Sequence, residues 1–156
     1  GGEDPKFIAR RLLISASEDI GLANPTALVM ANNCFQAVEK IGYPEARILL
    51  SQTVIYLATS EKSNSAYLAI NQAMKYVKEN GAASIPLHLR NAPSELMRNL
   101  DYGKDYKYAH DYPGNFVAQE YLPEGLSGVQ FYHPAINKRE IDLQRKISNW
   151  WGKKYQ

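Results

Sequence analysis

The stretch DPKFIARRLLISASEDIG, residues 4–21, decides the fold class because it reads as a complete amphipathic helix. Asp4 can accept a hydrogen bond from a free amide of the first turn, and Pro5 suits the first helical position, where no backbone N–H is needed. Apolar side chains follow at helical spacing until Gly21. The stretch therefore predicts a helix that opens at Asp4–Pro5 and runs towards Gly21.

Three further segments before residue 82 have similar punctuation. One opens at Asn24–Pro25 and stops near Gly42, and the next opens at Pro44. Thr53 and Val54 leave a strand as the weaker alternative for that segment, but its length favours a helix. Ser63 or Asn64 can cap the last segment, which ends at Gly81.

The last of these segments carries an apolar stripe at the spacing i, i+3, i+7, i+10. Its members are Tyr67, Ile70, Met74 and Val77. Such a stripe is typical of a helix face that packs in a core or against another subunit, and periodicity alone does not separate the two.

Beyond Gly81, closely spaced prolines exclude long helices until residue 138. We expect one short helix at 94–100, a brief strand at 84–89 or 129–132, and a helix again over 138–151. The prediction is an all-α fold, an antiparallel helical array in a single domain, 1–156. It divides into a four-helix portion at 1–81, an irregular tyrosine- and proline-rich segment at 82–137, and a C-terminal helix at 138–154.

Composition indicates one soluble, cytoplasmic domain. The 156 residues are 45% hydrophobic with a net charge of +2, and no apolar run is long enough to span a membrane. The start Gly1–Gly2 has neither a methionine nor the features of a signal peptide, so we expect a fragment of a longer protein. The lone Cys34 excludes an intramolecular disulfide and a multi-cysteine zinc site.

Few motifs suggest catalysis. No G-x-x-x-x-G-K-[ST] motif is present, so we expect no ATP site, no cofactor and no metal in this chain. The three histidines are more than twenty residues apart, which gives a metal site a low prior. His110–Asp111 can in principle pair a base with its orienting carboxylate, although structural hydrogen bonding is the better interpretation.

Two features suggest binding. Tyrosines between 102 and 132, among them Tyr106 and Tyr108, alternate with lysines as in a base-stacking groove, but packed loops have the same mixture. Residues 138–154, which include Lys146, hold six basic and two acidic side chains, a balance of +4. A solvated helix face is the default interpretation and a phosphate-contacting patch the minority one.

Long ordered motifs across nearly the whole chain resemble the C-terminal region of the RarA/MgsA family, relatives of the Werner-helicase-interacting ATPase. The motifs are Gly1–Pro5 with Ile8–Arg11, Ala16–Gly21 with Ala23 and Pro25, Tyr56–Ala58 with Lys62–Asn64, Pro86–Pro93, Tyr102–Gly103 with Tyr106–Asp111, and Tyr121–Pro123.

The resemblance implies a helical domain similar to a clamp-loader collar, which assembles a AAA+ ATPase into a homotetramer. It also implies a parent whose separate N-terminal module binds ATP and magnesium. That parent would act with DNA and the single-stranded-DNA-binding protein at stalled replication forks, associated with the bacterial nucleoid. None of the family's ATP-contacting residues can be placed on this chain.

The leading hypothesis is therefore an oligomerisation domain without enzymatic activity of its own, with no membrane partner. The alternative is a module that contacts single-stranded DNA, and a helical hydrolase around His110 is third. The candidate interface or DNA contacts are Arg10, Arg11, Lys62, Asn64, Arg90, Tyr106, Tyr108, His110 and Lys146. Arg10 and Arg11 suit a relay between modules, and Lys62–Asn64 an anion site, although salt bridging and simple capping explain them as well.

Overall fold

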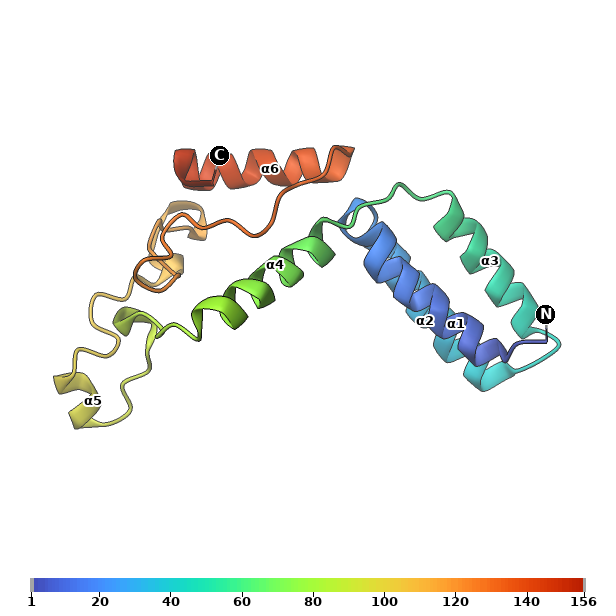
Figure 1. Cartoon of the computed structure of the whole chain (residues 1–156), viewed down its shortest axis with the longest axis horizontal. Coiled ribbons are helices and arrows are strands. Elements are labelled where there is room, and N and C mark those ends of the chain that lie inside the picture. Colours follow the sequence, from blue (N-terminus) through green and yellow to red (C-terminus); the bar gives the residue numbers. More distant parts are fainter. Residues whose placement is uncertain (1, 156) are drawn as a thin grey trace. The chain divides into compact units, whose positions relative to one another are not determined.

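A computed structural model describes residues 2–155, and within that range it contains helices and no strand (Figure 1). The all-α prediction is confirmed, while the collar-like arrangement and the division at 81 and 137 stay predictions. The chain forms two compact units. Unit 1 holds the residues up to 72 together with 131–144, and unit 2 holds 73–130 together with the residues from 145 on.

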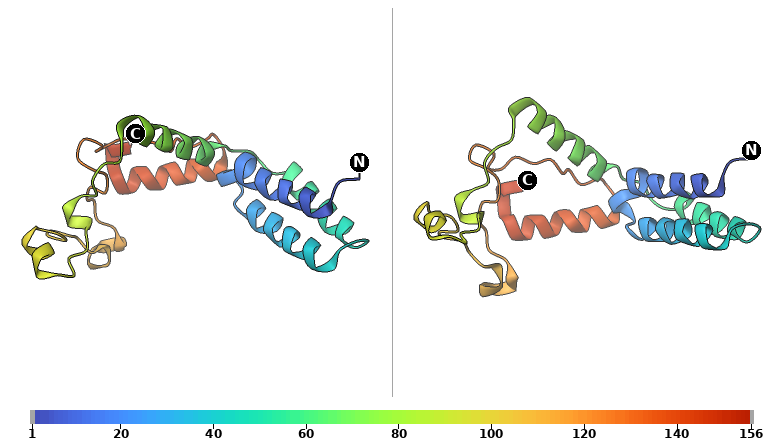
Figure 2. Two further views of the ribbon diagram at one scale, coloured as in Figure 1. Left: turned by 60° about the horizontal axis from the view of Figure 1, so that its bottom comes forward. Right: turned by 90° about the horizontal axis from the view of Figure 1, so that it is seen from below.

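Unit 1 is built on three antiparallel helices, α1 (Pro5–Ser15), α2 (Thr26–Ile41) and α3 (Ala46–Ala58), with α2 beside both others (Figure 2). Two groups of buried side chains hold the helices together. The members are Ala9, Cys34, Val38, Ala46 and Leu50 in one group, and Ala16, Ile20, Ala27, Ala31 and Leu57 in the other. Half of them are alanines, which let the helix backbones approach closely.

The helix starts agree only in part with their predicted caps. The Asp4 carboxylate accepts a hydrogen bond from the backbone N–H of Lys6 at 2.7 Å, as predicted. Asn24 does not cap α2 with its side chain. Its amide instead donates to the Tyr56 hydroxyl at 3.1 Å and to the Ser60 hydroxyl at 3.0 Å, so it ties the start of α2 to the end of α3. Thr53 and Val54 lie within α3, so the strand alternative is wrong there.

The helix that was expected to run towards Gly21 changes form on the way. The α-helix ends at Ser15, a π-helical turn covers Ala16–Ile20, and a 3-10 turn covers Gly21–Ala23. The wider turn presents the Asp19 carbonyl, which accepts the backbone N–H of Ser63 at 2.8 Å. Gly21 is needed here because its φ is +48° and a Cβ would lie 2.6 Å from the Ser63 carbonyl oxygen. The turn therefore fixes the position of Ser63, which lies just before the helix that begins at Ser65.

The remaining α-helices are α4 (Ser65–Asn80), α5 (Glu95–Asn99) and α6 (Lys138–Trp151). The predicted short helix and C-terminal helix are thus confirmed, and the Ser94 hydroxyl caps α5. Neither predicted strand forms: 84–89 contains a 3-10 turn at Leu87–Leu89, and 129–132 has no regular structure. Pro86 supplies no N–H for a ladder, and its carbonyl closes the turn by accepting from Leu89. No helix that the structure describes is long and apolar enough to cross a membrane.

Candidate functional site

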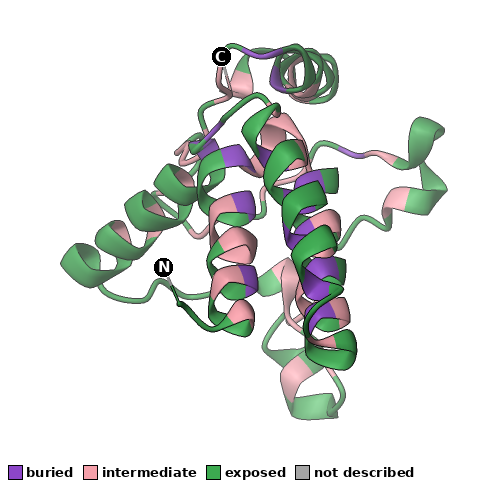
Figure 3. Cartoon of the chain, turned by 90° about the vertical axis from the view of Figure 1, so that its right-hand side faces the viewer, coloured by how far each residue is buried: buried purple, intermediate pink, exposed green. Residues whose placement is uncertain are grey.

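Helix α4 carries an uncovered apolar stripe. Tyr67, Ile70, Met74 and Val77 are between 47% and 64% exposed. The helix buries a single residue, Ser65, at its first position, and the rest of it is exposed or half-buried. Figure 3 shows the chain coloured by burial, and exposed and half-buried residues cover most of its ribbon. The stripe is therefore uncovered along α4, unlike the buried faces of α1, α2 and α3.

A second uncovered apolar surface lies on unit 1, between α1 and α2. It is a hollow of about 560 Å³, lined by Leu13, Ile14, Ser17, Leu28, Val29 and Asn32. Leu28 and Val29 are 45% and 57% exposed. Because the buried alanines of α1 and α2 face each other and α3, these larger side chains remain on the open side.

A buried carboxylate, that of Glu140, joins three separate segments of unit 1. One of its oxygens accepts from the Ser65 hydroxyl at 2.5 Å and from the Tyr132 hydroxyl at 2.9 Å, and the other accepts from the Asn137 amide at 2.6 Å. The Asn137 side-chain oxygen in turn accepts the backbone N–H of Glu140 at 2.9 Å, which caps α6. The Ser63 hydroxyl donates to that of Ser65 at 3.0 Å. The start of α4 and the start of α6 are thus fixed to each other.

Glu140 remains ionised although it is fully buried. Desolvation raises the pKa of this carboxyl, but hydrogen bonds from Ser63, Ser65, Asn137 and Tyr132 favour the charged form and together lower the pKa to about 2. Burial and the neighbouring carboxylate raise the pKa of Tyr132 to about 12, so its hydroxyl stays protonated and can donate. The network is polar, satisfied and largely buried, and it acts as a structural joint between the starts of α4 and α6.

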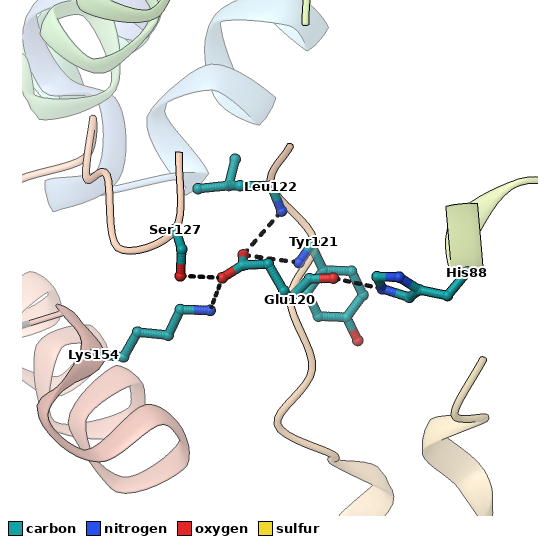
Figure 4. A network of polar contacts seen from close by, with 6 residues as sticks. All are labelled: His88, Glu120, Tyr121, Leu122, Ser127 and Lys154. Atoms are coloured by element: carbon teal, nitrogen blue, oxygen red, sulfur yellow. Dashed lines mark hydrogen bonds and ion pairs between the residues drawn. The ribbon is translucent and has the colours of Figure 1, made fainter. Parts of the chain in front are cut away.

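A second carboxylate network, around Glu120, organises unit 2 (Figure 4). One oxygen of Glu120 accepts from the Ser127 hydroxyl at 2.5 Å and from the Lys154 ammonium at 2.9 Å. The other accepts the backbone N–H groups of Tyr121 and Leu122, both at 3.0 Å. These bonds, that from Ser127 first, lower the pKa of Glu120 to about 2. The carbonyl of Glu120 also meets the His88 ring at 2.7 Å.

Aromatic side chains surround that network. The Phe116 ring stacks on Trp150, with centroids 5.8 Å apart, and meets Trp151 edge-on at 5.2 Å. The Lys154 ammonium lies 4.7 Å from the centre of the Trp151 ring. Trp150 is nevertheless 55% exposed. Unit 2 therefore contains both the exposed indole of Trp150 and the lysines near the C-terminus, Lys153 and Lys154.

The candidate residues of unit 1 lie on exposed surface. Arg10 places its guanidinium 5.1 Å from the centre of the Phe7 ring, and Arg11 is exposed on the same helix. Lys62 and Asn64 are exposed beside the two buried serines of the α4 start. The structure does not bring the arginine pair and Lys62 to one site.

Among the candidate residues of unit 2, one has a structural role and the others are exposed to solvent. Arg90 is half-buried, donates to the Ile85 carbonyl at 2.7 Å and to the Tyr102 hydroxyl at 3.1 Å, and so shapes the loop between them. The others are exposed, and the rings of Tyr108 and His110 lie 5.1 Å apart. These exposed candidates are Tyr106, Tyr108, His110 and Lys146.

Sequence reasoning missed Glu140 and Glu120, the two best-connected carboxylates. The spacing Asn137-x-x-Glu140 has the form of a helix-capping pair and signals the start of α6. Nothing in the sequence points to Ser65 and Tyr132 as its other partners, because they come from distant segments. Glu120 has no comparable signal.

These features define a class: a helical domain with a buried polar joint and uncovered apolar surfaces. The chain belongs to the family described as MgsA AAA+ ATPase C terminal, whose model matches residues 1–151.

Curated relatives agree with this assignment. The chain is 47% identical over 148 residues to replication-associated recombination protein A of Coxiella burnetii, covering 94% of this chain and 34% of that protein. It is 36% identical over 148 residues to the Escherichia coli K12 protein of the same name, covering 94% and 33%. It is also 37% identical over 145 residues to ATPase WRNIP1 of Dictyostelium discoideum, covering 89% and 17%. The chain thus spans about a third or less of the length of these relatives.

Proposed function

We propose that this chain is the homo-oligomerisation domain of a DNA-dependent AAA+ ATPase of replication, recombination and repair, and that it forms a tetramer. The exposed stripe of α4 is the observation that carries the proposal. An isolated helix of this length is only marginally stable in water, so most of its stability must come from packing. A second copy of the chain can provide that packing.

The energetics support this assignment. Burying one large apolar side chain contributes about 1.5–3 kcal/mol, so covering the four residues of the stripe offsets a large part of the cost of association. Contiguous apolar surface of this kind is uncommon on monomers and marks interaction sites.

The parent protein, in this proposal, carries a separate N-terminal module that binds ATP and magnesium and partners this domain. The relatives named above are a replication-associated recombination protein and an ATPase, which supports such a parent. The chain itself would have neither cofactor nor ATPase activity. ATP hydrolysis by the 156-residue chain alone, above the rate of a buffer blank, would contradict this part.

Analytical ultracentrifugation of the chain tests self-association. We expect a tetramer at micromolar concentration, and a shift towards monomer in Met74→Glu, which places a charge in the stripe. Gln72→Glu is the matched control, because it introduces the same charge at an exposed position on the opposite side of α4 from the stripe. A wild-type chain that sediments as a monomer throughout would refute the proposal.

A second function, contact with single-stranded DNA, is favoured by one observation in unit 2. Exposed Trp150, backed by Phe116, belongs to the same unit as Lys146 and Lys153. Unit 2 has ten basic and seven acidic side chains, a balance of +3, whereas unit 1 has eight and nine, a balance of −1. An indole beside lysines suits base stacking together with phosphate contact.

Fluorescence anisotropy with a labelled oligonucleotide tests that second function. We expect binding that weakens as salt rises, a loss of about 1–3 kcal/mol in Trp150→Ala, and a smaller loss in Lys146→Gln. Tyr43→Ala, an exposed aromatic in unit 1, is the control. Absence of binding at low salt would remove this function.

A further inference from the structure

We propose that the α4 stripe of one copy seats in the hollow between α1 and α2 of a second copy. This inference rests on the proposed self-association and adds the two surfaces that meet. Each copy would then offer one convex and one concave surface, and the contact would be heterologous.

The concave partner is suited to an apolar occupant. Four of the six residues that line the hollow are Leu13, Ile14, Leu28 and Val29, and both of its sides belong to α1 and α2. Those helices pack through buried alanines, so the walls of the hollow are held by the core of unit 1. A volume of about 560 Å³ has room for several large side chains of a docked helix.

Helix α4 fits this hollow better than the other exposed apolar helix face does. Its stripe extends over eleven residues, from Tyr67 to Val77. The outer face of α3 also exposes Ile48 and Ile55, but polar Ser51 and Gln52 interrupt it midway. A row of apolar side chains suits an apolar groove, because no polar group then has to lose its water on binding.

Charge supports the same pairing. Glu18 is exposed next to Ser17, at the end of the hollow formed by the π-helical turn Ala16–Ile20. Lys75 and Lys78 each follow a residue of the stripe, Met74 and Val77, and both are exposed, with the Lys75 ammonium also 3.9 Å from the Glu79 carboxylate one turn further on. When the stripe of one copy enters the hollow of the next, the lysines can face that carboxylate and favour one orientation of the helix.

A heterologous contact makes a prediction that an isologous one does not. One variant can lose its hollow and another its stripe, and the two together still offer one intact stripe and one intact hollow. Val29→Glu spoils the hollow but keeps the stripe, and Met74→Glu spoils the stripe but keeps the hollow. A mixture retains one intact interface, formed by the stripe of the first variant and the hollow of the second, and should therefore give a heterodimer.

Sedimentation velocity on each variant and on an equimolar mixture is the experiment. We expect both variants alone to be monomers, with a dissociation constant raised on the order of tenfold or more, and the mixture to give a dimer. Ile55→Glu on α3 should associate as the wild type does. Far-UV circular dichroism checks the fold, which both exposed positions should tolerate. If Val29→Glu misfolds, Asn32→Arg blocks the same hollow from its polar rim.

The outcomes separate the two levels of the proposal. A wild-type chain that is monomeric overturns the proposed function itself. A wild-type oligomer that survives Val29→Glu or Asn32→Arg overturns this inference alone, because that result indicates contact between two α4 stripes. A mixture that stays monomeric also overturns it, because one intact pair of surfaces should then be present. Loss of association in Ile55→Glu but not in Met74→Glu would assign the contact to α3 and also overturn it.

Discussion

The two units each place one carboxylate at the centre of a polar network, and the two networks differ in what surrounds them. Glu140 in unit 1 is fully buried and is held by neutral donors from three segments. The side chain of Glu120 in unit 2 is 30% exposed and pairs with the Lys154 ammonium. The pKa of each carboxyl is lowered to about 2.

The difference shows that a similar pKa does not imply a similar contribution to stability. Water can replace the partners of Glu120, because its site is open on one side. Ser65 and Asn137 are buried with Glu140, so these two donors depend on the carboxylate, while Tyr132 is half-buried. The stability of unit 1 should therefore be sensitive to substitutions in its network, and the stability of unit 2 should be less so.

Both tryptophans of the chain lie in unit 2, at positions 150 and 151, so their fluorescence reports on the unfolding of that unit separately.

The largest effect is expected from Glu140→Ala. It leaves the buried Ser65 hydroxyl and Asn137 amide without an acceptor, together with the half-buried Tyr132 hydroxyl, and each unsatisfied buried group costs about 1–3 kcal/mol. We expect unit 1 to lose about 3–5 kcal/mol, measured by urea unfolding followed by circular dichroism. Glu120→Ala is the matched control and should cost about 1 kcal/mol or less. Equal losses in the two variants would refute the contrast between the units.

Acid should weaken unit 1 through the same group, by less than the alanine substitution does, since a protonated carboxyl still accepts hydrogen bonds. The folded-state pKa of Glu140, about 2, lies below its ordinary value of 4.5, so its stabilisation is present above pH 4.5 and is lost as the pH falls towards 2. Glu140→Gln should flatten the loss of stability over that window. Glu120→Gln should flatten it less, because solvent screens that site. Thermal unfolding at a series of pH values measures both slopes.

Gly21→Ala tests the contact between the π-helical turn and Ser63, just before the start of α4. Both Gly21 and Gly42 have positive φ, +48° and +71°, so alanine at either position is strained by about 1–3 kcal/mol. Only at Gly21 does the added Cβ also meet the Ser63 carbonyl oxygen, at 2.6 Å, while nothing lies within 4 Å at Gly42. The melting temperature should fall further in Gly21→Ala than in Gly42→Ala. Identical melting temperatures would mean that the π turn does not hold the α4 start.

The sequence predicts the elements of this fold better than their connections. Local chemistry is sufficient for the start of α1 at Asp4, for α5 at Ser94 and for α6 over 138–151. The π turn at Ala16–Ile20 is not predictable locally, because it depends on a backbone bond to Ser63, more than forty residues away. Asn24 misleads for the same reason, since Tyr56 and Ser60 compete for its amide.

The candidate site divides in the same way. The spacing of Tyr67, Ile70, Met74 and Val77 reveals the stripe, but only the packing of the chain shows that it is exposed. The sequence shows Arg90 and Tyr102 as members of long motifs, but it does not predict that the Arg90 guanidinium donates to the Tyr102 hydroxyl. Self-association and DNA contact stay predictions, because neither follows from the fold of one chain.

The smallest effect is expected from Lys154→Met, which removes the ion pair with Glu120 and keeps the contact of the alkyl chain with Trp151. A pair whose side chains are 23% and 30% exposed contributes about 1 kcal/mol or less, and salt screens part of it. Tryptophan fluorescence should show unit 2 slightly less stable at low salt and the difference from wild type shrinking at high salt. Lys153→Met, an equal change of charge at an exposed neighbour, should show no such salt dependence. A loss as large as that of Glu140→Ala would mean that unit 2 depends on its carboxylate as strongly as unit 1 does.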